Sequence, residues 1–293
     1  MSRRRRRQWA VPLLFLAPSL AVMALFSFYP MLHAIGMSFH RWRILGDAQF
    51  LGFDNYTMLL QSNQFWVALR NTLLFGLITV PVGVVLALGS ALLLNMPLRA
   101  RGFFRGVIFF PVTVSMVVIA LIWSWMFSEN YGIVNSALEA VGIEPQNWLA
   151  EPTRALAVIM VMSIWKGFGY GMVIYLAGLQ TIPETVYEAA RLDGASRRQM
   201  LWHITIPLLN PTTLFVTVIS FIGSFQVFDQ VYVMTEGGPG YSTSVLVHLI
   251  YELAYVRFRM GVACAAAIIL LLITVAFTLI QIRFIRPQTG EGS

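Results

Sequence analysis

Hydroxyl-bearing and small side chains recur at helical spacing within two apolar stretches of the sequence. The first set is Thr213, Thr217, Ser220 and Ser224, and the second is Ser163, Gly167 and Tyr170. In a helix each set lies on one face, because residues three and four apart are neighbours. Such a wall suits a sugar, whose hydroxyl groups need hydrogen bonds and whose flat faces stack on aromatic rings. The alternative is helix packing, since small and hydroxylated residues also bring helices together in lipid.

Groups for covalent, metal or nucleotide chemistry are few. Cys264 is the only cysteine and lies in an apolar run, so we expect a packed core thiol. The four histidines, His33, His40, His203 and His248, lack metal-ligand spacing to one another. No G-x-x-x-x-G-K-S/T phosphate loop occurs, and the only lysine, Lys166, is followed by Gly167. We therefore expect no enzymatic activity and no cofactor or metal bound by this chain.

The composition is that of a membrane protein. Of the 293 residues, 58% are hydrophobic and 11% are charged, whereas a soluble domain carries about 25% charged residues. The mean hydropathy is +0.72. The net charge of +7 comes almost wholly from arginines clustered at the ends of apolar segments. This pattern indicates topology signals rather than nucleic-acid binding.

The elements that position these residues are membrane-spanning helices. Each span needs about 20 apolar residues, because backbone amides must bond internally in lipid. Six segments qualify, which predicts an all-α integral membrane protein with six transmembrane helices: 9–32, 67–95, 104–127, 154–178, 209–234 and 260–283. The chain then divides into a basic tail (1–8), a first span with its external loop (9–66), a five-helix core (67–283) containing a polar segment (181–210), and a C-terminal tail (284–293).

The arginine clusters predict the orientation. Those on one side are Arg3–Arg7, Arg99, Arg101 and Arg105, Arg191, Arg197 and Arg198, and Arg283 and Arg286. Because cytoplasmic loops carry the excess of basic residues, both termini are expected in the cytoplasm. A cleaved signal peptide is the alternative for the N-terminus. An uncleaved anchor is favoured, since the apolar run is long and ends without a small-residue cleavage site.

The polar segment between the fourth and fifth spans is predicted to form a helix, a turn and a second helix. Thr181 is expected to cap the first helix, with Pro183 in its first turn and Glu184 completing a capping box. Asp193–Gly194 ends it, and Ser196 is expected to cap the second helix. The apolar residues of the segment predict either a protein-docking surface or a helix lying on lipid head groups.

Short motifs add a family resemblance. The polar segment holds Glu188–Ala189–Ala190, Asp193–Gly194–Ala195, Ile204, Ile206–Pro207 and Pro211, and after the fifth span come Thr235–Glu236–Gly237–Gly238–Pro239 and Ser242–Thr243. The first set resembles the EAA loop of binding-protein-dependent ABC transporter permeases. The second resembles a segment of the carbohydrate-importing group, the maltose, glycerol-3-phosphate and multiple-sugar type. Tyr29–Pro30 and Gly52–Phe53–Asp54–Asn55–Tyr56 extend the resemblance toward the N-terminus.

The resemblance implies a type I ABC importer transmembrane domain in the cytoplasmic (inner) membrane of a bacterium or archaeon. The EAA helix would be a coupling helix that docks on an ATPase dimer, and ATP and Mg²⁺ would bind to those partner subunits. The implied coupling residues are Tyr187, Glu188, Ala189, Ala190, Asp193, Gly194 and Ala195. A second homologous permease, an external or periplasmic solute-binding protein and a carbohydrate complete the implied partners, besides the lipid bilayer.

The resemblance also implies a substrate path. Its positions are Ser163, Gly167, Tyr170, Ser220, Ser224 and Val227, with Val112 and Met116 on the third span. Several of these side chains are small or apolar, which permits a site built mainly by the partner permease. The turn Gly237–Gly238–Pro239–Gly240 would lie at the outer gate or beside the docked binding protein.

Lys166 is expected near the middle of the fourth span, where a charge costs at least about 3 kcal/mol. It therefore needs a partner or water. Asp229 is the one acid within a neighbouring span, but it is offset by roughly 10 Å at 1.5 Å per residue. We expect a packing or gate role for these two residues.

The sequence thus favours the permease subunit of an ATP-driven importer of a carbohydrate or a related polyol phosphate. The alternative is a helical membrane signalling or channel protein that uses the cytoplasmic helix-turn-helix to dock a regulator.

Overall fold

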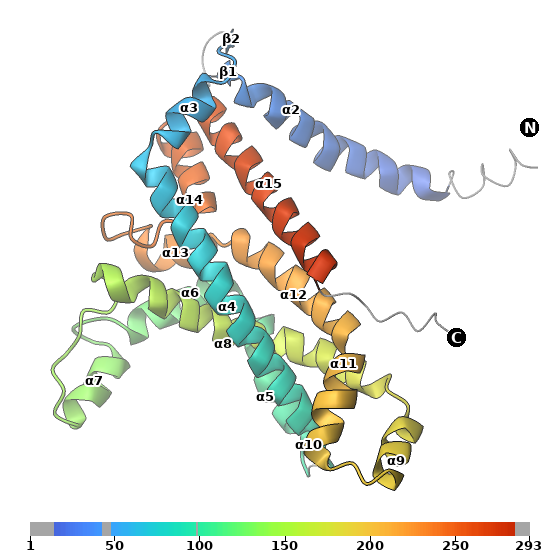
Figure 1. The fold of residues 1–293 in the computed structure, drawn as a ribbon. Helices are drawn as coiled ribbons and strands as arrows, with labels where there is room; N and C mark the ends of the chain where they lie inside the picture. Colours follow the sequence, from blue (N-terminus) through green and yellow to red (C-terminus); the bar gives the residue numbers. More distant parts are fainter. Residues whose placement is uncertain (1–14, 43–47, 98, 285–293) are drawn as a thin grey trace, which may run out of the picture. The chain divides into compact units, whose positions relative to one another are not determined.

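The computed structural model describes residues 15–42, 48–97 and 99–284, which are mostly helical (Figure 1). Four of these helices are long and apolar enough to cross a membrane, and two bent helix pairs raise the number to six if each pair is one span. The chain forms two compact units, residues 1–62 with 250–269 and residues 63–249 with 270–293.

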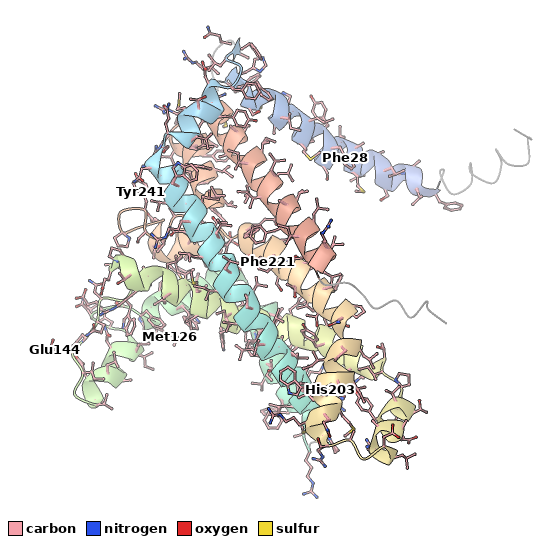
Figure 2. All side chains as sticks on the ribbon, viewed as in Figure 1. Phe28, Met126, Glu144, His203, Phe221 and Tyr241 are labelled. Atoms are coloured by element: carbon pink, nitrogen blue, oxygen red, sulfur yellow. The ribbon has the colours of Figure 1, made fainter. Side chains whose placement is uncertain are left out.

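Three predicted spans match continuous helices. They are α4 (Asn63–Asn95), α8 (Pro152–Gln180) and α15 (Met260–Phe284). For the span predicted over 9–32, the structure describes a helix over Phe15–Ser38. Residues 9–14 of the prediction lie outside the described part. This helix continues past Tyr29–Pro30 because a π-helical turn, η1 (Ala24–Phe28), precedes α2 (Tyr29–Ser38) and lets the Tyr29 N–H donate to Ala24 O. Most of its side chains, Phe28 among them, are exposed (Figure 2).

The first unit joins the ends of two apolar helices through a small polar hairpin. Strands β1 (His40–Arg41) and β2 (Gln49–Phe50) pair antiparallel and are followed by α3 (Asp54–Leu60). Buried Asn55 donates to Ser38 O at 2.8 Å and to His40 O at 3.0 Å. A π-helical turn, η3 (Glu252–Val256), leads to the start of α15.

The core of the second unit is the packing of α4 against α8, with α12 (Asn210–Phe225) on both. Glycines on α8 allow these close approaches. A Cβ at Gly171 would lie 3.0 Å from Ala87 Cβ on α4, and one at Gly178 would lie 2.6 Å from Thr212 Oγ1 on α12. Small residues thus set the interhelical distance, as is common between helices in lipid. The ring of Phe221 on α12 (labelled in Figure 2) lies tilted against that of Phe277, with the ring centroids 5.7 Å apart.

The third predicted span is not one straight helix. It consists of α5 (Arg101–Thr113) and α6 (Met116–Met126), bent by 96° at Val114–Ser115. Pro111 lies in the last turn of α5, and Val114 has extended backbone angles. The prediction of one continuous helix over 104–127 was therefore wrong, because hydropathy measures the length of an apolar run and carries no information on helix direction.

The fifth predicted span is broken as well. α12 ends at Phe225, and a separate helix, α13 (Asp229–Thr235), begins after three intervening residues. The residues preceding α12 form α10 (Arg197–Met200), a π-helical turn η2 (Leu201–Thr205) and α11 (Ile206–Leu208), which together meet α12 at 62°. Pro211 lies in the first turn of α12, as a proline at a helix start should.

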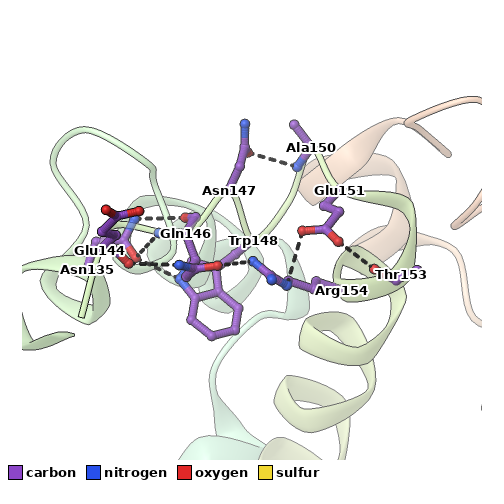
Figure 3. Close-up of polar contacts among 9 residues, drawn as sticks. All are labelled: Asn135, Glu144, Gln146, Asn147, Trp148, Ala150, Glu151, Thr153 and Arg154. Carbon is purple, nitrogen blue, oxygen red and sulfur yellow. Dashed lines mark hydrogen bonds and ion pairs between the residues drawn. The ribbon is translucent and has the colours of Figure 1, made fainter.

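Two ordered connections complete the second unit. The loop that carries α7 (Ile133–Ala140) is centred on buried Asn135, whose Oδ1 accepts hydrogen bonds from Gln146 N and Trp148 Nε1 (Figure 3). At the end of this loop, Arg154 donates a hydrogen bond to Gln146 Oε1 and forms an ion pair with Glu151. The loop between α13 and α14 (Leu246–Tyr251) is held to α4. Its anchors are Asn71, which donates to Ser242 O and Ser244 O, and Thr72, which accepts from Leu246 N.

Candidate functional site

A cavity of about 210 Å³ lies among α4, α6, α8 and α12. Seven of the residues predicted for a substrate path line it: Met116, Ser163, Gly167, Tyr170, Ser220, Ser224 and Val227. The eighth, Val112, is not in this lining. Thr213 and Thr217 also lie outside it, so the hydroxyl stripe of α12 divides into a packing part and a cavity part.

Two of the cavity serines already donate hydrogen bonds within their own helices. Ser163 Oγ donates to Ile159 O at 2.7 Å, and Ser224 Oγ donates to Phe221 O at 2.8 Å. A hydroxyl that donates this way keeps acceptor capacity for another group. Ser163 uses it for Gln230, whose Nε2 donates to Ser163 Oγ at 3.2 Å. The serines therefore combine the packing and the cavity interpretations.

Gln230 was missed by sequence reasoning. It is 4% exposed and lines the cavity. A continuous fifth span gave no reason to place it there. The break after Phe225 redirects the chain so that α13 brings Gln230 beside Ser163. Three polar residues inside an apolar run were the available signal for this break: Gln226, Asp229 and Gln230.

The lining contains polar, small and aromatic groups and, among its described residues, no Asp, Glu, Lys, Arg or His. Tyr170 is 48% exposed and offers a ring. A Cβ added at Gly83, Gly167 or Gly223 would meet nothing within 4 Å, so these positions leave open space. This wall can hydrogen-bond and stack on a neutral polar molecule. It offers no ionic partner and no acid-base pair.

Lys166 finds its partner on the broken span. Its Nζ donates to Pro111 O at 3.3 Å and to Val112 O at 3.4 Å, the last carbonyls of α5. A cation there also complements the negative end of the helix dipole. Asp229 instead begins α13, where it is exposed.

The predicted coupling segment is a helix, a turn and a second helix (Figure 1). The first helix, α9 (Glu184–Leu192), ends at Asp193, and Gly194 has φ +79°, the left-handed conformation expected there. Ser196 caps α10, as predicted, and does so in a capping box with Gln199 that was not predicted. The capping predicted for α9 was wrong. Pro183 is its N-cap, and Thr181 Oγ1 donates back to Gly178 O at 2.8 Å, because α8 extends to Gln180.

The two faces of α9 differ. Ala190 is buried, and Tyr187 Oη lies 3.1 Å from Thr205 Oγ1 on η2, which fixes the segment to the chain leading into α12. Glu188, Ala189 and Gly194 are exposed, and Leu192 is 90% exposed. Ala195 N–H donates to Ala190 O at 2.9 Å and closes the turn. The segment is thus a well-fixed projection with an uncovered apolar tip.

The fold, the cavity and the projection together define an all-α multi-pass membrane protein with a cavity between its helices. Residues 79–286 match the family described as the binding-protein-dependent transport system inner membrane component. This chain belongs to that family.

Relatives of known type span nearly the whole chain. The lactose transport system permease protein LacF of Rhizobium radiobacter is 38% identical over 92% of this chain and 92% of its own. The trehalose/maltose transport system permease protein MalF of Thermococcus litoralis is 32% identical over 96% of each chain. The sn-glycerol-3-phosphate transport system permease protein UgpA of Agrobacterium fabrum is 31% identical over 96% of this chain and 97% of its own.

Solved structures agree with this assignment. A bacterial ABC transporter that imports the acidic polysaccharide alginate matches with a TM-score of 0.81 and 27% identity over 97% of both chains. A bacterial alginate ABC transporter in complex with an alginate pentasaccharide-bound periplasmic protein matches with a TM-score of 0.82 and 26% identity over 98% of both chains. The fold is therefore that of an ABC importer transmembrane domain, and the chain is a permease subunit.

Proposed function

We propose that this chain is one permease subunit of an ATP-driven importer that moves a carbohydrate delivered by an external solute-binding protein. The observation that carries the proposal is the projection α9–α10, an EAA segment with an uncovered apolar tip on an otherwise firmly attached base. The relatives named above that transport lactose, trehalose or maltose support the substrate class. Family membership favours transport over the signalling or channel alternative.

The cavity favours a neutral sugar or oligosaccharide over a polyol phosphate. Its described lining has hydroxyls, an amide and an aromatic ring but no cationic side chain. Phosphate binding in a low-dielectric site calls for a cation or a cluster of N–H donors. A neutral sugar needs only hydrogen bonds and a stacking surface. Because the cavity is small, the second permease would supply the remaining wall.

The projection would transmit the motion. Leu192 and Ala189 fill a cleft on an ATPase subunit, and Glu188 approaches a basic residue there. ATP and Mg²⁺ bind to the ATPase dimer, which has two clefts, so a second homologous permease supplies the other projection. The projection and both termini lie in the cytoplasm, as the arginine clusters indicate.

A change of backbone strain in the turn tests the coupling. Gly194→Val forces a β-branched residue into φ +79°, at a cost of about 1–3 kcal/mol, and alters the angle between α9 and α10. We expect substrate-stimulated ATP hydrolysis by the reconstituted complex to fall about tenfold or more.

Gly142→Val is the matched control. Gly142 also has φ +79°, also has open space around its Cβ position, and lies in the loop after α7. It should leave stimulated ATP hydrolysis unchanged. Equal activity of both variants and the native complex would contradict the coupling role.

A further inference from the structure

A second cavity, of about 310 Å³, lies in the first unit and is separate from the substrate path. It is lined by Arg41, Trp42, Leu51, Asn55, Met58, Phe258, Arg259, Gly261 and Val262. All of these belong to the hairpin, α3 and the residues that begin α15.

The walls of this cavity are fixed by buried contacts. Asn55 is 3% exposed and holds the carbonyls of Ser38 and His40, so the strand that carries Arg41 is fixed to α3. Gly261 lets α15 approach the same strand, since a Cβ there would lie 2.1 Å from His40 O. The hollow is therefore a built feature of the unit.

Two arginines line this hollow, and its described lining contains no acid. Neither Arg41 nor Arg259 forms an ion pair with a described residue, and Arg259 Nη1 lies 3.9 Å from Met58 Sδ. The acid nearest to Arg259 along the chain, Glu252, is held by Arg257 at 2.7 Å. Exposed Asp54 lies in the first turn of α3, outside the lining. Residues 43–47 contain one arginine and one aspartate, so this part of the sequence adds no net charge to that of Arg41 and Arg259.

The ends of two candidate spans indicate that the cavity lies at the depth of lipid head groups. Ser38 ends the apolar helix Phe15–Ser38, and Met260 begins α15. The residues that follow Ser38 and those that precede Met260 therefore mark where two spans leave the hydrocarbon. Trp42 is a side chain typical of this interface. Phe258 and Met58, 55% and 45% exposed, provide apolar surface beside the guanidinium groups.

We propose that this cavity binds the phosphodiester head group of an anionic phospholipid, with Arg41 and Arg259 on the phosphate and the adjoining apolar side chains against the acyl chains. The planar guanidinium forks match two phosphate oxygens each. With the orientation proposed above, the lipid belongs to the outer leaflet. Arginines are uncommon in translocated loops, and lipid binding gives them a reason to be there.

Lipid retention tests this site independently of transport. The complex of this chain with its natural partner subunits is purified in detergent with added phosphatidylglycerol, and bound lipid is counted by native mass spectrometry. The native complex should retain phosphatidylglycerol in preference to phosphatidylcholine. Arg41→Gln with Arg259→Gln should weaken phosphatidylglycerol binding about tenfold or more.

Matched variants separate geometry from charge. Arg70→Gln with Arg105→Gln removes the same charge from outside the cavity, leaves the Arg257–Glu252 pair intact and should retain the lipid. Arg41→Lys with Arg259→Lys keeps the charge but loses the planar guanidinium groups, so it should bind the lipid with intermediate affinity. This variant also tests the site if the glutamine variant fails to assemble.

Three results would overturn the proposal. The first is equal lipid retention by the glutamine variant and the native complex. The second is displacement of phosphatidylglycerol by inorganic phosphate, which would make this a site for a free anion. The third is unchanged lipid retention with weaker association of the solute-binding protein, which would assign the arginines to an acidic protein surface.

Discussion

At the scale of single residues, Lys166 shows why an expensive charge is retained within a span. The charge costs at least about 3 kcal/mol to insert, and its two long hydrogen bonds to Pro111 O and Val112 O, at about 1.5 kcal/mol each for a charged donor, do no more than offset that cost. Stability alone therefore does not explain this lysine. Its bonds hold the end of α5, where the chain bends by 96° into α6.

Lys166→Met should separate stability from function. We expect the variant to melt at the same or a higher temperature than the native complex, because the charge within the span is gone. Transport should fall severalfold, because the α5 end is no longer held. Uptake into proteoliposomes and thermal unfolding are the two measurements. Lys166→Arg, which keeps the donor, should restore most of the transport, and native uptake by the methionine variant would disprove the role.

Residue types and motifs predicted much of the candidate site. Hydroxyl spacing and family resemblance together named seven cavity residues, and Gly194 has the left-handed angle that its position after Asp193 requires. Gln230 and the Lys166 partners were not predictable in the same way. Both depend on where the chain breaks, and the Lys166 bonds join residues 54 and 55 positions apart.

At the scale of elements, α8 serves as packing surface and cavity wall along one helix. Gly171 and Gly178 have no room for a larger side chain beside α4 and α12, whereas Gly167 faces open space in the cavity. Small residues on one helix thus have different roles, which their spacing alone does not reveal.

Gly167→Leu should obstruct the path without unfolding the protein. Leucine favours a helix over glycine by about 1 kcal/mol, so α8 itself is not weakened. We expect substrate uptake to fall about tenfold or more while complex assembly is unchanged. Gly89→Leu on α4 is the control, since Gly89 also has open space but is not in the cavity lining. Equal uptake by the two variants would argue against substrate passage beside Gly167.

Element existence was more predictable than element direction. The apolar runs of α4, α8 and α15 are long and end at polar residues, so their bounds follow within a few residues. The bends within the third and fifth predicted spans did not follow, because hydropathy is the same for straight and broken helices. The continuation of the first helix past Pro30 likewise depends on a π-helical turn that no motif announces.

At the scale of the whole molecule, most functions of an importer are assigned to other chains. The sequence has no phosphate-binding loop, and the cavity of this chain is small and has no charged side chain among its described lining. Under the proposed function, movement enters through a surface of this chain that an ATPase subunit contacts. Leu192, 90% exposed at the tip of α9, is the described apolar residue best placed for that contact.

Cross-linking at this tip tests the central claim most directly. In a Cys264→Ala background, Leu192→Cys should cross-link to the ATPase subunit of the assembled complex, with a yield that changes with the bound nucleotide. Tyr131→Cys, 78% exposed in the loop before α7, should not cross-link to that subunit. Absence of any Leu192→Cys cross-link in every nucleotide state, or labelling of that cysteine by an impermeant reagent added outside the membrane, would contradict the account.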